Sequence, residues 1–423
     1  MTVPDTPQKP AMPTRPTNRI MTETPAVKLA TRLVLLSVLA TGMGQSMTFA
    51  LLAPLGREAG FSVVQIGTVI TCSSLMFTLS SPVWGRTCDR WGRRPVLLIG
   101  QFGYAFGVLL FAATFSTGMS GLLAAGLFYP LAIGSRVLMA LLMSAAPSAA
   151  AAYIADTTSA AKRTAGMGRL GAARTLGAIL GPAVGGALAV FGLLTPLYCA
   201  GGIAMISALA LAAVVREPVR RITPGVKRAR LKLFDRRYFP FILVGFVTFL
   251  GFSMMSQTIG FYFQDRFHLD GPATAQILGL GLMVSAGASL LAQALLVQRL
   301  RLTPPQLLKS GLPLLIVGFA LLPVADSQPL LVAIMGIIGL GMGLIGPGFT
   351  AGASLAVGPD EQGAVGGLVS ACPSSGFVLG PLVGTALYQY SPTLPYLCAG
   401  ALMVPLLIYA SRIQFRPDQT ENP

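Results

Sequence analysis

The chain has 423 residues, of which 53% are apolar and only 10% are charged, against roughly 25% charged residues in soluble domains. This composition excludes a soluble enzyme, a disordered chain and a nucleic-acid-binding protein. The net charge of +16 comes from 30 Lys and Arg against 14 Asp and Glu, so the placement of the basic residues has to explain it. The five cysteines are an odd number without a close-spaced pair, which argues against a disulfide framework and a metal site. We also expect no cofactor.

Residues 1–28 are polar and proline-rich, and we interpret them as a disordered cytoplasmic tail without a signal peptide. The rest of the chain contains about twelve apolar stretches, each with the roughly 20 residues that one helical membrane crossing needs. Their approximate limits are 30–55, 63–84, 95–116, 122–154, 172–191, 195–215, 239–262, 273–297, 307–325, 328–352, 365–388 and 393–411. The sequence therefore predicts an all-α integral membrane protein.

The basic residues test this count. If both termini are cytoplasmic, 26 of the 30 Lys and Arg lie in segments on the cytoplasmic side of the membrane. Such an excess is the normal orientation signal of membrane proteins, so we expect a multi-pass protein of the inner (plasma) membrane. The basic segment 216–238 is a cytoplasmic linker between six-helix bundles at 29–215 and 239–411, and 412–423 is a second cytoplasmic tail.

The two halves show weak internal identity. The fifth stretch contains Gly177-Ala178-Ile179-Leu180-Gly181-Pro182-Ala183-Val184-Gly185-Gly186, and the eleventh contains Gly376-Phe377-Val378-Leu379-Gly380-Pro381-Leu382-Val383-Gly384-Thr385. Gln45 of the first stretch aligns with Gln257 of the seventh. Parallel six-helix repeats with a substrate site between them are a transporter architecture.

A charged loop joins the second and third stretches. It reads Gly85-Arg86-Thr87-Cys88-Asp89-Arg90-Trp91-Gly92-Arg93-Arg94-Pro95. This segment resembles the G-x-L-a-D-r-x-G-r-k loop of the major facilitator superfamily, with Thr87 in place of the usual Leu. Glycines permit a tight reversal, and Asp89 is able to cap a neighbouring helix N-terminus. The arginines are able to pair with acids such as Asp156.

The resemblance implies a fold of two pseudo-symmetric six-helix bundles. It also implies that the loop locks the cytoplasmic side in the outward-open state, with Gly85, Asp89, Arg90, Gly92, Arg93 and Arg94 forming the gate. The alternative is a merely basic turn.

Two helical motifs extend the resemblance. Gly177, Gly181, Pro182, Gly185 and Gly186 match the g-x-x-x-G-P-x-x-G-G element of the drug:proton antiporter branch, which implies export; the alternative is ordinary small-residue packing.

Arg136 is a cation inside the fourth stretch, where an arginine costs roughly 2.5–3.5 kcal/mol on insertion scales. In the family it resembles the arginine associated with proton transfer, with Asp156 as the other group available. It could instead bind a substrate anion, or have a structural role with carbonyls or Gln45 as partners. None of the 14 acids lies well inside a stretch, which weakens the case for proton coupling and favours an anionic or neutral solute over a cation.

Polar residues of the first, seventh and eleventh stretches are candidates for the substrate cavity: Gln45, Thr48, Ser253, Gln257 and Ser374. We expect a monomeric secondary transporter that exports a small amphipathic molecule, with protons as the coupling ion and the lipid bilayer as its surroundings. Export of an endogenous anionic metabolite, such as a carboxylate siderophore, is a second hypothesis. A non-transporting membrane sensor or scaffold is a third, and it is disfavoured because the chain has no extra soluble domain.

Overall fold

The structure is a computed structural model that describes residues 25–158, 162–218, 234–300, 302–358 and 361–413. The helices are α1 (Pro25–Glu58), α2 (Val63–Trp91), α3 (Arg93–Met119), α4 (Ala125–Met143), α5 (Ala145–Thr157), α6 (Arg163–Leu188), α7 (Thr195–Val214), α8 (Phe239–Phe267), α9 (Gly271–Leu291), α10 (Gln298–Leu300), α11 (Pro304–Leu321), α12 (Gln328–Leu355), α13 (Gln362–Tyr390) and α14 (Leu394–Ser411). Short 3₁₀ segments cover Ala189–Phe191 and Leu322–Val324, and a π-helical segment covers Ala292–Val297.

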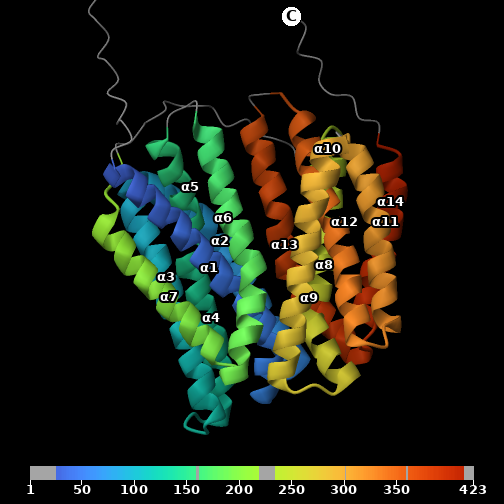
Figure 1. Cartoon of the computed structure of the whole chain (residues 1–423), viewed down its shortest axis with the longest axis horizontal. Helices are drawn as coiled ribbons and strands as arrows, with labels where there is room; N and C mark the ends of the chain where they lie inside the picture. The colour runs from blue at the N-terminus through green and yellow to red at the C-terminus, as the bar shows by residue number, and fades with distance from the viewer. Residues whose placement is uncertain (1–24, 159–161, 219–233, 301, 359–360, 414–423) are drawn as a thin grey trace, which may run out of the picture.

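Within these residues, twelve helical segments are long and apolar enough to cross a membrane, as the sequence predicts. They form two bundles side by side, the N half from α1 to α7 and the C half from α8 to α14 (Figure 1). The end of the bundle where α1 begins and α14 ends is called the terminal side below, and the opposite end is called the far side.

Two boundaries differ from the prediction. Helix α1 already begins at Pro25, so residues 25–28 are helical and are not part of a disordered tail, while 1–24 lie outside the described residues. The long fourth stretch is divided at Ser144 into α4 and α5. Pro147 lies in the first turn of α5, and a proline has no N–H to continue the α4 hydrogen-bond ladder. Most of the 216–238 linker and the end of the second tail also lie outside the described residues.

Glycine contacts establish how the halves correspond. In the N half, Gly181 of α6 packs against Ser46 of α1. In the C half, Gly380 of α13 packs in the same way against Ser253 of α8. Two further contacts repeat this match. The contact of Gly177 with Met43 in the N half corresponds to that of Gly376 with Leu250 in the C half, and the contact of Gly185 with Met47 corresponds to that of Gly384 with Met254. The repeat of helix pairs is therefore present in three dimensions.

The same contacts correct the alignment of the two glutamines. Ser46 corresponds to Ser253 and Met47 to Met254, so Gln45 corresponds to Phe252 and not to Gln257. The residue that corresponds to Gln257 in the N half is Ala50. The two glutamines are not symmetry partners, and the prediction of a matched pair was wrong.

Candidate functional site

An ion pair joins the two halves on the far side. Arg57, in the last turn of α1, donates from Nη1 and Nη2 to the two carboxylate oxygens of Asp265 of α8, at 2.5 and 2.8 Å. Tyr388 of α13 donates to the same carboxylate at 2.6 Å. The Arg57 guanidinium also lies 5.2 Å from the ring centre of Phe261. Because Asp265 has partners from both halves, it ties the far side together.

A cavity of about 560 Å³ opens beside this ion pair. Its lining comes from the ends of α1 and α8 and from the start of α9: Arg57, Glu58, Gln264, Asp265, His268, Leu269, Asp270 and Gly271. The charged groups of the ion pair are therefore reachable from the far side.

Close backbone contacts reinforce the closure. A Cβ added to Gly279 of α9 would overlap the carbonyl oxygen of Pro182 in α6. In the symmetry-related place, a Cβ on Gly67 of α2 would meet the side chain of Thr385 in α13 and, at 3.0 Å, the carbonyl oxygen of Pro381. Helices of opposite halves approach this closely only where a residue without a side chain lies between them.

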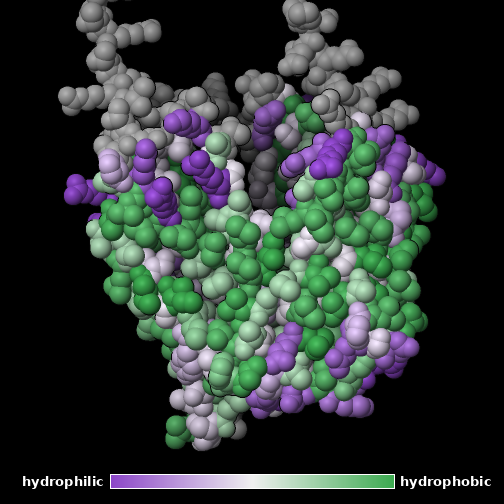
Figure 2. All heavy atoms as spheres, viewed as in Figure 1, coloured by the Kyte–Doolittle hydropathy of each residue, from purple (hydrophilic) through white to green (hydrophobic). Residues whose placement is uncertain are grey.

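The terminal side is different. Gly168 and Gly171 of α6 and Gly366 and Gly367 of α13 have no atom of another element within 4 Å of an added Cβ. Figure 2 shows the surface hollowed between the two halves on this side, with hydrophilic side chains at its rim. In this structure, then, the halves meet on the far side and separate on the terminal side.

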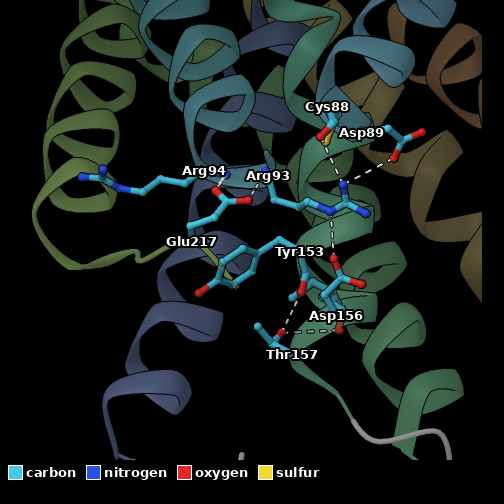
Figure 3. Close-up of polar contacts among 9 residues, drawn as sticks. Cys88, Asp89, Arg93, Arg94, Tyr153, Asp156, Thr157 and Glu217 are labelled. Atoms are coloured by element: carbon cyan, nitrogen blue, oxygen red, sulfur yellow. Dashed lines mark hydrogen bonds and ion pairs between the residues drawn. The ribbon is translucent and has the colours of Figure 1, made fainter. Parts of the chain in front are cut away.

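The gate motif lies on the terminal side, and it is not the loop that the sequence predicted: residues 85–91 are the last turns of α2, and Arg93 begins α3. Arg93 and Arg94 contact residues of the N half (Figure 3). Arg93 Nε donates to Asp156 of α5 at 2.8 Å, which is the ion pair expected between the motif and that acid. Arg93 Nη1 also donates to the Cys88 carbonyl at 3.1 Å and lies 3.4 Å from Asp89. Gly92 has a φ of 112°, a conformation that favours glycine, and it makes the reversal between α2 and α3.

Glu217 is a residue of this site that the sequence interpretation missed. Its carboxylate accepts hydrogen bonds from the backbone N–H groups of Arg93 and Arg94, at 2.7 and 2.8 Å. It thereby caps the positive end of α3, a task that we expected of Asp89. The side chain of Asp89 is instead 69% exposed. Glu217 is the second residue after the sixth apolar stretch, and its place as an acid near the start of the basic segment 216–238 is the one signal that could have suggested it.

Arg136 of α4 is 2% exposed and is the largest fully buried side chain in the described structure. Its guanidinium carbon lies 5.4 Å from the ring centre of Phe49 and 5.5 Å from that of Phe111. Nη1 contacts the Met139 sulfur at 3.7 Å, whereas Nε has no hydrogen-bond partner. Neither Gln45 nor a backbone carbonyl accepts a bond from it among the contacts of the described residues.

Arg136 and Asp156 are not brought together. Twenty residues of α4 and α5 separate them, or about 30 Å of helix, and Asp156 is occupied by Arg93. Arg136 has no ion pair with an acid in the described part of the chain. The two groups therefore do not form a single site in this state.

The antiporter-motif residues have two roles in packing. Gly177, Gly181 and Gly185 let α6 lie against α1 within the N half, as the small-residue interpretation holds. Gly186 and Pro182 face α9 of the other half, since a Cβ on Gly186 would lie 2.8 Å from the Ala275 carbonyl oxygen. One segment thus builds a half and also contacts its neighbour.

The candidate cavity residues have unequal surroundings. Thr48 is buried and bonds to the Gly44 carbonyl at 2.7 Å, and Ser253 is buried against Gly380, so both belong to helix packing. Gln45 is partly buried, while Ser374 donates weakly to Ser370 at 3.5 Å. Gln257 is 5% exposed, and its Nε2 has no hydrogen-bond partner.

Two similar helical bundles that touch at one end and part at the other define a membrane transporter of the type that exposes a central site to one side at a time. The comparisons agree with that class. The chain belongs to the Major Facilitator Superfamily, whose family model matches residues 34–381. This family and fold are those of transporters and not of enzymes.

Curated relatives are bacterial drug-resistance proteins. The chain is 26% identical to Multidrug resistance protein 2 of Bacillus subtilis, over 80% of this chain and 84% of the relative. It is 28% identical to the class C tetracycline resistance protein of Escherichia coli, over 77% and 80%. It is 22% identical to the quinolone resistance protein NorA of Staphylococcus aureus, over 85% of this chain and 90% of the relative for strain MRSA252.

A solved structure has the same fold. A bacterial homologue of the iron transporter ferroportin, in an inward-facing state, superposes with a TM-score of 0.70 at 18% identity, covering 91% of this chain and 99% of that one. By sequence and motifs the chain is similar to the drug:proton antiporter branch of its family, as its interpretation from sequence held.

Proposed function

We propose that the protein exports a small amphipathic molecule from the cytoplasm by proton-coupled antiport, and that the described structure is its inward-facing state. The observation that carries this proposal is the asymmetry of contacts between the halves. The Arg57–Asp265 ion pair and the glycine contacts close the far side, while the terminal side is hollow. A substrate therefore enters from the terminal side.

We also propose that the protein lies in the plasma membrane with its terminal side facing the cytoplasm. The support is the charge distribution, since 26 of the 30 Lys and Arg lie in segments that the twelve-helix order puts on this side. Export as the direction is supported by the multidrug, tetracycline and quinolone resistance relatives.

The gate motif has a defined task in this proposal. In the inward-facing state Asp89 is exposed, and Gly366 and Gly367 near the start of α13 face open space. When the terminal side closes, Asp89 meets a helix N-terminus of the C half and the loop holds the outward-open state. Arg93, Asp156 and Glu217 keep the loop in position for that contact.

Transport by proteoliposomes tests the function. With a pH gradient imposed, the wild-type protein should move tetracycline against its concentration gradient, and a protonophore should abolish the movement. Asp89→Asn should lower the rate at least about tenfold at unchanged protein abundance. Asp326→Asn, which changes an exposed far-side carboxylate, is the matched control and should leave the rate unchanged. Transport that ignores the pH gradient would refute the coupling.

Export of an endogenous anionic metabolite is a second candidate, and it is favoured because buried Arg136 has no acidic partner among the residues that the structure describes. If Arg136 binds an anion, Arg136→Lys should keep part of the activity because the charge survives, and Arg136→Gln should abolish binding. If Arg136 takes part in proton coupling instead, the Arg136→Gln variant should still bind substrate and exchange it down its gradient, and only pH-driven transport should fail. Unimpaired uphill transport by this variant would mean that Arg136 has a structural role only.

A further inference from the structure

The first helices of the two halves cross on the axis that relates them. A Cβ added to Gly260 of α8 would lie 2.8 Å from the Cβ of Ala53 in α1. Ala53 and Gly260 are also corresponding positions, because they follow Ser46 and Ser253 by the same number of residues. This contact between α1 and α8 forms the far-side end of the hollow that opens on the terminal side.

Helical spacing places specific side chains next to this crossing, on its terminal side. Phe49 lies four residues before Ala53 in α1, and Gln257 lies three residues before Gly260 in α8. Residues three or four apart share a helix face. Phe49 and Gln257 therefore lie one turn from the crossing, on its terminal side and at the inner end of the hollow.

A second aromatic ring reaches this place from α13. The ring centres of Phe49 and Phe377 are 6.3 Å apart, with their planes inclined at 46°. Both side chains are partly exposed, and they belong to opposite halves. Aromatic pairs have centres 4.5–7 Å apart, so the distance of 6.3 Å is towards the upper limit of this range. The two rings therefore do not cover each other completely, and part of each ring face is available to a ligand.

Polar groups near these rings lack partners. Gln257 Nε2 is a buried donor without an acceptor, and burying such a group costs free energy. Behind Phe49 lies the Arg136 guanidinium, 5.4 Å from the ring centre and without an acidic partner in the described part of the chain. The surroundings of the ring pair thus offer hydrogen-bond donors and positive charge.

We propose that this place, between Phe49, Phe377 and Gln257, binds a planar aromatic molecule that carries a neutral or anionic hydrogen-bond acceptor. The ring of the ligand stacks on Phe49 and Phe377, and its acceptor takes the free Gln257 Nε2–H. The charge of Arg136 disfavours a cationic ligand. Because Phe49 and Phe377 come from different halves, the ligand holds both halves and leaves when they rearrange. This inference rests on the proposed export function and adds the substrate class.

Equilibrium binding to the purified full chain in lipid nanodiscs tests the proposal. Fluorescein serves as the planar anionic probe and ethidium as the planar cationic probe, both followed by fluorescence anisotropy, and citrate is added as a competing anion without a ring. Fluorescein should bind more tightly than ethidium, and citrate should not displace it. Tighter binding of ethidium, displacement by citrate, or no binding of fluorescein would each overturn the assigned class.

Variants test the residues. Phe49→Leu, Phe377→Leu and Gln257→Ala should each weaken fluorescein binding by about threefold to tenfold. Phe106→Leu, which removes a 55% exposed ring from α3, is the matched control and should bind like the wild type. Phe377→Tyr keeps the ring and should retain the affinity, which separates loss of the ring from a folding defect. Wild-type affinity in Phe49→Leu and Phe377→Leu, or equal loss in Phe377→Tyr, would refute the site.

This measurement is independent of proton coupling, because no gradient is present. Normal binding together with failed pH-driven transport would overturn the proposed function and leave the site intact. Normal pH-driven transport together with unchanged binding in the phenylalanine variants would overturn the site alone.

Discussion

Loss of the Asp265 charge should shift the protein toward a state that is open on the far side. In the described structure, which is closed on the far side, this carboxylate accepts two hydrogen bonds from Arg57 and one from Tyr388. Asp265→Asn keeps the size of the side chain but removes its charge and one acceptor oxygen. Since the two bonds from Arg57 join the halves only while the far side is closed, their loss should weaken the closed state specifically.

The size of the shift follows from the exposure of the pair. Arg57 and Asp265 have 31% and 36% of their side-chain surface exposed. Fully exposed ion pairs contribute about 0.2–1 kcal/mol, and hydrogen bonds to charged groups contribute about 1.5–3 kcal/mol. A half-buried bidentate pair lies between these ranges, at about 1–2 kcal/mol. The open-to-closed ratio should therefore rise roughly 5- to 30-fold.

Distances between spin labels measure this ratio. Cysteines at Leu122 and Tyr390, which are 79% and 85% exposed and lie at the far ends of opposite halves, carry the labels. They are introduced into a chain without its five native cysteines, all of which are free thiols. Asp265→Asn should increase the population with the longer label distance, and the double variant with Arg57→Gln should add little, because both remove the same interaction.

Asp326→Asn is the control, since it removes a negative charge from an exposed position of the C half on the same side. An unchanged distance distribution in Asp265→Asn, or the same shift in Asp326→Asn, would show that the ion pair does not hold the far side closed.

Three further variants address other contacts. Gly279→Ala places a Cβ against the Pro182 carbonyl and should favour the far-side-open state by about tenfold or more in the same spin-label measurement; unchanged distances would mean that the helices adjust. Glu217→Ala removes the cap of α3 and should lower the free energy of unfolding by about 0.5–2 kcal/mol, measured by thermal unfolding, with Glu217→Gln losing less. The bond from Arg237 holds the pKa of the Glu361 carboxyl below its usual range, so this pair stabilises the fold above the ordinary pKa of about 4.3 and ceases to do so as pH falls through the lowered value. The melting temperatures of wild type and Glu361→Gln should thus differ at pH 7 and converge in acid, and a difference that persists in acid would contradict this.

The fold was largely predictable because hydropathy reports each crossing directly. Twelve spans and two halves follow from apolar length and from the long basic interruption after the sixth span. The division at Ser144 was not predicted, because an apolar stretch looks the same whether its helix is continuous or broken. The correspondence of Gln45 with Gln257 was wrong for a related reason. An alignment of short identical segments compares residue types only. The true correspondence of positions in α1 and α8 is shown by glycine contacts, which exist only once two helices lie side by side.

Contacts of the site could be predicted only where the two interacting residues are close in sequence or lie on the same side of the membrane. Arg93 and Asp156 end on the same side by the order of the spans, and their ion pair was foreseen. Glu217 reaches the start of α3 from 123 residues away, and Tyr388 reaches Asp265 from the same separation. Such contacts depend on which helices become neighbours, and no periodicity along the chain encodes that.

The correspondence of the halves has a consequence for the number of ion pairs that hold the far side. Counted from the crossing of Ala53 with Gly260, Arg57 corresponds to Gln264, and Glu58 corresponds to Asp265. In a dimer of two identical halves, twofold symmetry would make every such contact twice, so an arginine followed by an acid would form two ion pairs. This chain has one of them, because the position that corresponds to Arg57 holds the amide Gln264 and offers Glu58 no guanidinium. A far side with both pairs would be harder to open, and Gln264→Arg is the substitution that supplies the second guanidinium.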